Sequence, residues 1–205
     1  METEVLSVEL PDSLSQACAI LQAGGLVAFP TDTVYGVGVV AFNLTSIQRL
    51  FKAKARQGDK AIPVLIGEYA DLERVAKRLN KMTAVLASRF WPGPITLVVL
   101  KHAQLPPNIS PDSTIGVRMP DHSVALSLLR LAGPLAVTSA NLSGQANTTT
   151  AQEVFQQLHG RIDLILDGGC TPGSRPSTVV NCTGRRPVIL REGPVSIDDI
   201  QAALA

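Results

Sequence analysis

The sequence predicts an α/β fold, a single domain with a twisted, mixed sheet flanked by helices. Short apolar runs typical of strands alternate with amphipathic helical patterns along the whole chain, without internal repeats. The 205 residues suit one domain, and no linker rich in proline, glycine or serine divides them. With 45% hydrophobic and 17% charged residues, the composition is that of a globular protein. We therefore expect one domain over residues 1–205, in preference to two.

The first predicted elements are a helix and a short buried strand. Ser13 and Gln16 form a capping-box pattern ahead of apolar residues at helical spacing, and a pair of glycines at 24 and 25 ends the helix. Residues 26–29 follow as a buried strand, which leads through Pro30 into a loop with a fixed entry.

A second helix is expected to end near Ala53. Thr45 and Gln48 repeat the capping box before it, and Lys54 and Arg56 follow at its C-terminal exit. Cations are favoured at that end of a helix by roughly 0.3 to 1 kcal/mol.

The remaining elements follow the same signals. Strands are predicted at 62–66, 95–100, 115–118, 135–138, 164–166, 177–181 and 188–191. Helices are predicted at 123–131, 151–158 and 197–203, with one broken or two short helices over 71–90. Thr150 and Glu153 cap the helix at 151. The prolines of the segment 91–94 fix the turn that enters the strand at 95.

The charge balance argues against a large field that attracts nucleic acid. Lysine and arginine total 18 against 17 aspartate and glutamate, a net charge of +1. Any anion site must therefore be local. Between Arg49 and Lys60, five of the six charged residues are basic. A solvated helix face is the alternative interpretation of such a run.

Three widely spaced cysteines, Cys18, Cys170 and Cys182, fit neither a disulfide framework nor a CxxC metal site. Reduced and mostly buried thiols are expected. The N-terminus is acidic where a signal peptide would be basic, and no apolar run approaches the roughly 18 residues of a membrane span. A cytoplasmic location without membrane contact is therefore expected.

Two polar triplets carry the strongest functional signal. Lys54-Ala55-Arg56 places two cations at a spacing of two, and Ser139-Ala140-Asn141 supplies hydroxyl and amide groups that read a polar ligand. Together they indicate a split nucleotide site, because arginine binds phosphate oxygens bidentately and lysine acts as a point charge. A solvated helix face and a simple turn are the structural alternatives.

Four further motifs surround these triplets: TDTVYG at 31–36, RMPDH at 118–122, STVV at 177–180 and REG at 191–193. A helix cap, a surface salt bridge or a proline turn would explain each one singly. His122 is expected to hydrogen-bond the backbone rather than act as a base. The chain has no GxxxxGK[ST] loop, no complete GxGxxG fingerprint and no GxSxG elbow, so P-loop, Rossmann and hydrolase chemistry are not expected.

In this order, the motifs resemble those of the YrdC/Sua5/TsaC family of threonylcarbamoyl-AMP synthases, over almost the whole chain. The resemblance implies the YrdC-like fold, an open α/β twisted sheet with a positively charged concave surface. It also implies an L-threonylcarbamoyladenylate synthase, a nucleotidyltransferase that makes threonylcarbamoyl-AMP and pyrophosphate from L-threonine, bicarbonate and ATP. That product serves the threonylcarbamoyladenosine (t6A) modification of tRNA.

The same resemblance implies roles for individual residues. Threonine binding falls to Thr33, Arg118, Ser139 and Ser177. ATP binding falls to Lys54, Arg56, Lys60, Thr114, Asn141, Thr149 and Arg191. Catalysis is expected from Lys54, Arg56, Ser139 and Asn141. No residue is assigned to a dedicated metal site, and Mg²⁺ is expected to arrive with ATP.

The cation segment departs from the usual pattern of the family. Ala55 and Gln57 flank Arg56 in place of glycine and proline, and residues 61–63 replace a Pro-Leu pair. Val37 replaces a commoner leucine. The cations of the family pattern, Lys54 and Arg56, are kept. Catalysis is expected to consist of positioning and charge neutralisation while the carbamate of threonine attacks the α-phosphate of ATP.

Two alternatives stay open. A non-enzymatic RNA-binding protein of the same fold, with tRNA or double-stranded RNA as partner, is supported by the local basic run. The near-neutral net charge and 4% aromatic residues weigh against it. A carbamoyl-transfer domain like those of hydrogenase-maturation proteins is disfavoured, since zinc-binding segments are absent. The resemblance also implies a downstream tRNA threonylcarbamoyl transferase as partner, and the short form without the C-terminal domain of longer relatives.

Overall fold

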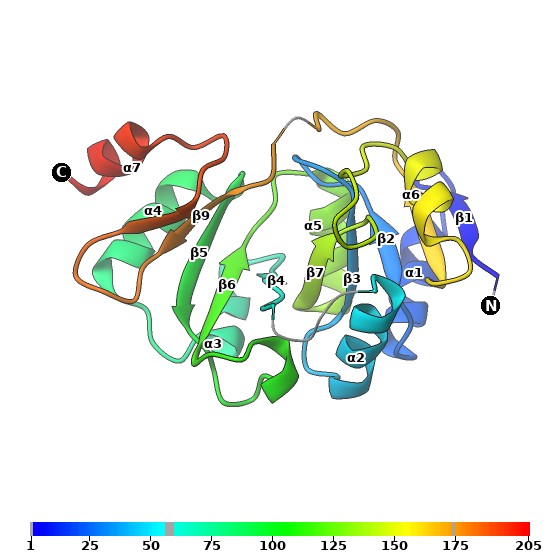
Figure 1. Cartoon of the computed structure of the whole chain (residues 1–205), viewed down its shortest axis with the longest axis horizontal. Helices are drawn as coiled ribbons and strands as arrows, with labels where there is room; N and C mark the ends of the chain where they lie inside the picture. The colour runs from blue at the N-terminus through cyan, green and yellow to red at the C-terminus, as the bar shows by residue number, and fades with distance from the viewer. Residues whose placement is uncertain (1, 56–59, 174) are drawn as a thin grey trace.

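The computed structural model describes residues 2–55, 60–173 and 175–205, which form a ten-stranded sheet flanked by helices (Figure 1). The strand order is β1-β8-β2-β3-β7-β4-β6-β5-β9-β10. The strands are β1 (Glu4–Ser7), β2 (Val27–Phe29), β3 (Gly36–Val40), β4 (Val64–Leu65), β5 (Ile95–Leu100), β6 (Thr114–Arg118), β7 (Leu135–Ser139), β8 (Leu164–Asp167), β9 (Thr178–Asn181) and β10 (Val188–Arg191). The helices are α1 (Ser13–Gln22), α2 (Leu44–Ala53), α3 (Leu72–Val75), α4 (Lys81–Phe90), α5 (Ser123–Ala132), α6 (Ala151–Leu158) and α7 (Ile197–Leu204), with 3₁₀ turns η1 (Tyr69–Asp71) and η2 (Pro107–Ile109).

Parallel and antiparallel pairs are combined across the sheet, so the mixed sheet predicted from the sequence is confirmed. β8 pairs in parallel with β1 and β2, β4 with β6, and β5 with β9. β3 runs antiparallel to β2 and β7, β7 to β4, β5 to β6, and β9 to β10. Parallel pairs require crossover connections, which here contain the helices.

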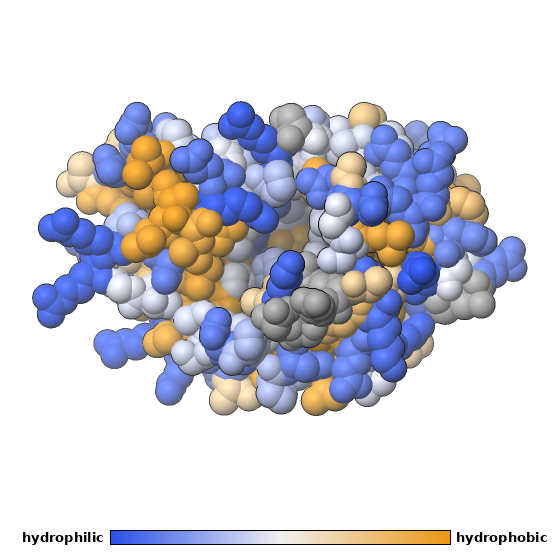
Figure 2. All heavy atoms as spheres, in the orientation of Figure 1, coloured by the Kyte–Doolittle hydropathy of each residue, from blue (hydrophilic) through white to orange (hydrophobic). Residues whose placement is uncertain are grey.

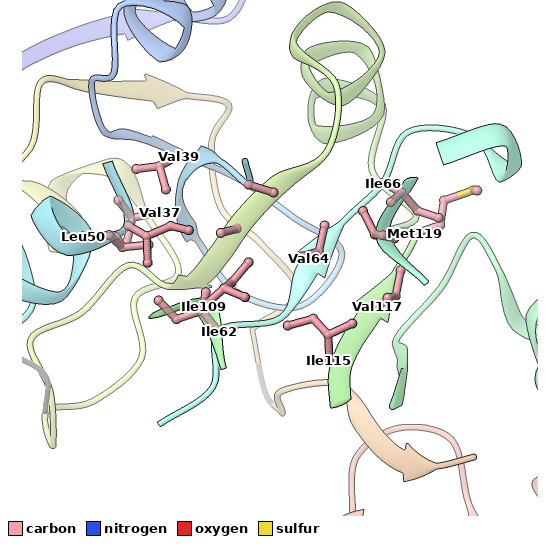
Figure 3. Packing of buried hydrophobic residues seen from close by; sticks show 14 of the residues in the cluster. Val37, Val39, Leu50, Ile62, Val64, Ile66, Ile109, Ile115, Val117 and Met119 are labelled. Atoms are coloured by element: carbon pink, nitrogen blue, oxygen red, sulfur yellow. The ribbon is translucent and has the colours of Figure 1, made fainter. Parts of the chain in front are cut away.

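The two faces of the sheet pack against different helices. Leu135 and Val137 of β7 pack with α1 and α5, whereas Ala136 between them faces the core to which α2, α4 and α6 contribute. This alternation is the two-residue period of a strand. Figure 3 shows part of the second core, where Val37 of β3 lies beside Leu50 of α2.

The sheet twists strongly between its ends. In Figure 1, α5 lies behind β7 and α4 lies behind β9, although these helices pack on opposite faces of the sheet. Neighbouring strands rotate by roughly 20 to 25° relative to one another. The face that α1 and α5 cover at one end is therefore turned toward the viewer at β5 and β9. Figure 1 shows no helix of the described chain in front of those strands.

Two strands, β1 and β3, escaped the sequence prediction. β3 contains Gly36 and Gly38, which made the segment resemble a loop because glycine is depleted in strands. A Cβ on either glycine would meet the side chain of Val137, at 2.7 and 3.0 Å respectively. The glycines therefore give β3 room to pair with β7. The strand predicted at 62–66 is shorter, Val64–Leu65.

The predicted helix caps were right for α6 and wrong for α1 and α2. Thr150 Oγ1 accepts the N–H of Glu153 at 3.2 Å, as expected. The N-cap of α2 is Asn43, whose side chain accepts a first-turn N–H at 3.0 Å, so Thr45 already lies inside the helix. The N-cap of α1 is Asp12, which makes no side-chain capping bond. Asn43 offers the stronger acceptor two residues before the hydroxyl predicted from the pattern.

The thiols of all three cysteines are free, but they differ in burial. Cys182 is buried, Cys18 is half-buried and Cys170 is exposed, so the expectation of mostly buried thiols holds only in part. In the described residues, every helix is too short or too polar to cross a membrane.

Candidate functional site

A cavity of about 460 Å³ opens over the middle strands, on the face that carries Leu65 and Val137. Figure 2 shows this side of the molecule hollowed near its centre. Strands β4 to β7, the loop after β2 and the start of β9 contribute to the lining. Six of the residues predicted to bind substrates line it: Thr33, Thr114, Arg118, Ser139, Ser177 and Arg191. Motifs spread over most of the chain therefore meet in one cavity.

Arg118 is the most constrained of these side chains. It lies at the end of β6, is buried, and forms an ion pair with Asp32 through Nη2. Nη1 donates to Thr33 Oγ1 at 3.1 Å, and Nε donates to the carbonyl oxygen of Gly93 at 3.0 Å. The turn predicted at 91–94 thus supplies an acceptor for the site. Burial lowers the pKa of Arg118 and nearby Arg191 lowers it further, while Asp32 opposes both effects.

Arg191 and Ser177 form a second polar group in the cavity. Arg191 Nε and Nη2 donate to the carbonyl oxygen of Ser177 at 3.1 and 2.9 Å, and Nη2 also reaches Ser177 Oγ at 3.2 Å. The hydroxyls of Ser177 and Thr96 share a hydrogen bond of 2.8 Å. A register shift between Ile189 and Arg191 precedes this contact. Burial lowers the pKa of Arg191. The arrangement fixes a cation against the end of β9, where it can meet an anionic ligand.

Lys54 and Asn141 are close together but outside the cavity lining. Lys54 follows α2 as predicted and is 1% exposed. Its ammonium donates to the carbonyl oxygens of Ser139 and Asn141 and lies 3.5 Å from Asn141 Oδ1. Asn141 Nδ2 donates to Leu142 and Gln145 carbonyls at 2.9 and 2.7 Å. Lys54 of the first triplet therefore meets Ser139 and Asn141 of the second, through hydrogen bonds from its ammonium to main-chain carbonyls that join the end of α2 to the end of β7.

Of the other predicted nucleotide residues, Arg56 lies outside the described residues, and Lys60 is exposed. Thr149 donates from N and Oγ1 to the carboxylate of Glu153 at 2.6 and 3.1 Å, which lowers the pKa of Glu153. Neither Lys60 nor Thr149 is among the residues that line the cavity.

Sequence reasoning missed several polar residues of the site. Asp32, the ion-pair partner of Arg118, belonged to the TDTVYG motif but had no predicted role. Thr96 and Asp112 line the cavity and belonged to no motif. The prediction that His122 hydrogen-bonds the backbone was wrong. Its Nδ1 atom is buried and has no hydrogen-bond partner among the described residues. Burial lowers the pKa of His122, whereas the charges of Asp32 and Asp121 raise it.

The fold and the cavity define an α/β protein with a polar cavity that Arg118 and Arg191 line, and arginine side chains suit an anionic ligand. A family model for Sua5_yciO_yrdC, with the description "Telomere recombination", matches residues 19–193. The chain belongs to this Sua5/YciO/YrdC family, which confirms the family suggested by the motifs.

Two curated relatives carry the name threonylcarbamoyl-AMP synthase. The protein from Pyrococcus abyssi is 40% identical over 92% of this chain and 56% of its own length. The protein from Bacillus subtilis is 39% identical over 100% of this chain and 62% of its own length. The crystal structure of P. abyssi Sua5 complexed with L-threonine has a TM-score of 0.94 and 37% identity, covering 100% of this chain and 61% of that one. The chain thus spans about three fifths of these relatives.

Proposed function

We propose that the chain is an L-threonylcarbamoyladenylate synthase, which makes threonylcarbamoyl-AMP and pyrophosphate from L-threonine, bicarbonate and ATP. The observation that carries the proposal is the meeting of Arg118, Thr33, Ser139, Ser177 and Arg191 in one cavity. The names of the two relatives support it, as does the threonine complex of P. abyssi Sua5. They support it over a non-enzymatic RNA-binding role.

The contacts divide the cavity into two parts. Arg118 beside Thr33 is suited to the carboxylate and polar groups of threonine. Arg191, held at Ser177, is suited to the phosphates of ATP, with Thr114 nearby on the lining. Lys54, Arg56 and Lys60 supply further positive charge beside the nucleotide, and Asn141 holds Lys54.

The chemistry needs no protein nucleophile. The amine of threonine and bicarbonate combine to a carbamate with loss of water. A carbamate oxygen then forms a bond to the α-phosphorus of ATP, and the bond from that phosphorus to the bridging oxygen breaks as pyrophosphate leaves. Arg118 and Arg191 orient the two reactants and neutralise negative charge, which is the main contribution available to such a transfer.

Mg²⁺ fits this site as a companion of the nucleotide. The described residues contain no group of three or more potential ligands of the His, Cys, Asp and Glu type. Asp112 is a single carboxylate on the lining, which suits an ion held mainly by phosphate oxygens and water. When bound, the ion would supply charge neutralisation on the triphosphate.

The product would serve t6A formation in tRNA. A separate tRNA threonylcarbamoyl transferase in the cytoplasm would move the threonylcarbamoyl group from the adenylate to an adenosine of tRNA, with AMP as the leaving group. The test uses the purified chain with ATP, Mg²⁺, bicarbonate and L-threonine. We expect pyrophosphate release that requires threonine and bicarbonate, and a nucleotide with the mass of threonylcarbamoyl-AMP. The matched control replaces threonine with D-threonine. Two results would refute the proposal. One is pyrophosphate release that does not depend on the amino acid, and the other is no release together with no binding of threonine or ATP.

A further inference from the structure

A buried chain of hydrogen bonds next to Arg118 fixes where the hydroxyl protons lie. Thr31 Oγ1 donates its only hydrogen to the carbonyl oxygen of Val34, at 2.7 Å. The hydroxyl oxygens of Thr31 and Thr33 are 3.0 Å apart, so the hydrogen between them must come from Thr33. Arg118 Nη1 donates to Thr33 Oγ1. Thr33 therefore offers a ligand a lone pair and no hydrogen, which makes it an acceptor.

Arg118 is the donor of the same subsite. Its Nε, Nη1 and Nη2 atoms each donate one hydrogen bond, to Gly93, Thr33 and Asp32 respectively. A guanidinium carries five N–H groups, so these contacts leave one hydrogen on Nη1 and one on Nη2. Two N–H groups on neighbouring nitrogens match the two oxygens of a carboxylate.

Asp32 fixes this orientation from the protein side. Its Oδ1 atom accepts from Arg118 Nη2, and the two side chains are 12% and 7% exposed. Oδ2 is buried and accepts no hydrogen bond from the described residues. Asp32 is not among the residues that line the cavity. Its effect on a ligand must therefore pass through Arg118.

We propose that Asp32 is a positioning residue of the amino-acid subsite, which aims Arg118 at the substrate carboxylate while Thr31 keeps Thr33 as an acceptor. This inference rests on the proposed function and deepens it. The subsite takes a carboxylate with a hydrogen-bond donor close by, the groups that an α-amino acid presents. Removing one partner of a buried ion pair leaves an uncompensated charge, so the orientation of Arg118 depends on Asp32.

The kinetic test compares Asp32→Asn, Asp32→Glu and Asp121→Asn. Asp121 is the matched control, because it is exposed and also lies near His122, but makes no ion pair with Arg118 in the described contacts. For Asp32→Asn we expect the KM for threonine to rise about 10- to 100-fold while the KM for ATP changes less than about 2-fold. Asp32→Glu should restore threonine KM to within about 10-fold of wild type, since the carboxylate is kept.

A ligand without the carboxylate sharpens the comparison. L-threoninol should bind weakly, and equally to wild type and Asp32→Asn, because it has no group for Arg118 to hold. A Thr31→Val variant offers a second route if Asp32→Asn does not fold. It frees the hydrogen of Thr33, and we expect threonine to bind several-fold more weakly with no change for ATP.

One NMR signal reports on position without turnover. Exchange of the Arg118 Nε proton with water should be slow in wild type and Asp121→Asn and faster in Asp32→Asn. Wild-type threonine KM in Asp32→Asn, or equal losses for threonine and ATP, would overturn the inference. If wild type binds no threonine, the proposed function fails, and unchanged Arg118 exchange in Asp32→Asn would still reject the positioning role.

Discussion

The buried ammonium of Lys54 donates a hydrogen bond to the main-chain carbonyl of Asn141, which ties the end of α2 to the loop after β7. A second bond from the same ammonium reaches the carbonyl of Ser139, a residue that lines the cavity. The backbone N–H of Ser143 in turn donates to the carbonyl of Lys54 at 3.0 Å. The lysine therefore supports the wall of the site from behind in this structure.

Replacement of this lysine should cost stability as well as activity. Lys54→Met leaves two buried carbonyls without their donor, so the free energy of unfolding should fall by about 2 to 4 kcal/mol. Urea unfolding of the variant checks this, with Lys52→Met on the exposed side of α2 as control. Unchanged stability with a raised KM for ATP would mean that Lys54 serves the nucleotide alone.

Arg191 should matter to the nucleotide more than to the amino acid. Its guanidinium is held by Ser177 at the cavity, so Arg191→Ala removes a charge-assisted contact worth roughly 1.5 to 3 kcal/mol, or about 10- to 200-fold in ATP affinity. Calorimetric titration with ATP measures the loss. Arg186→Ala, exposed on the turn before β10, is the control and should bind ATP normally. The prediction is wrong if threonine affinity falls as far as ATP affinity.

Ala55 has a backbone angle that favours glycine. Its φ is +50°, in the left-handed region, where an L side chain costs roughly 1 to 2 kcal/mol. Ala55→Gly removes this strain at some cost in chain entropy, so unfolding free energy should rise by about 0.5 to 1 kcal/mol. Thermal unfolding tests it beside Ala53→Gly, inside α2, which should destabilise. A lower melting temperature for Ala55→Gly would contradict the strain.

The thiols should react in the order of their exposure. Burial raises the pKa of Cys182 to about 11, so below that pH the group is mostly the unreactive thiol. At pH 8 we expect iodoacetamide to modify exposed Cys170 first and to leave Cys182 intact, as peptide mass mapping would show. Modification of Cys182 should appear as the pH rises toward 11, or when the chain is unfolded. Early labelling of Cys182 in the folded protein at pH 8 would count against this burial.

The sequence predicted most of the fold because strands and helices here have clear apolar patterns. α5 has buried residues at helical spacing, and β5 is a continuous apolar run of which most residues are buried. β3 escaped because Gly36 and Gly38 replace the side chains that signal a strand, and their reason is Val137 on a strand a hundred residues away. Such packing between distant segments has no local signal. The predicted start of α2 was wrong because two candidates for the N-cap compete. Asn43 and Thr45 are both acceptable N-cap residues.

For the site, motifs predicted which residues meet but not what each one contacts. Arg118, Thr33 and Ser177, which the motifs assign to one substrate, line one cavity. The ion pair between Arg118 and the carboxylate of Asp32 depends on the rotation of a single side chain. The spacing of residues in a motif does not encode that rotation. Lys54 was expected at phosphate, and its burial depends on the path of the chain after β7.

The cavity draws on residues from Thr31 to Arg191, which the strand order of the sheet brings together. Such a site has a high contact order, so it exists only once distant parts of the chain have joined. Any ligand that occupies it binds the native state alone. At 100 times its dissociation constant, that ligand would add about 2.7 kcal/mol to the free energy of unfolding. Bound substrate would then act as a reversible cross-link between distant parts of the sequence. A higher substrate concentration would raise the melting temperature of the native protein.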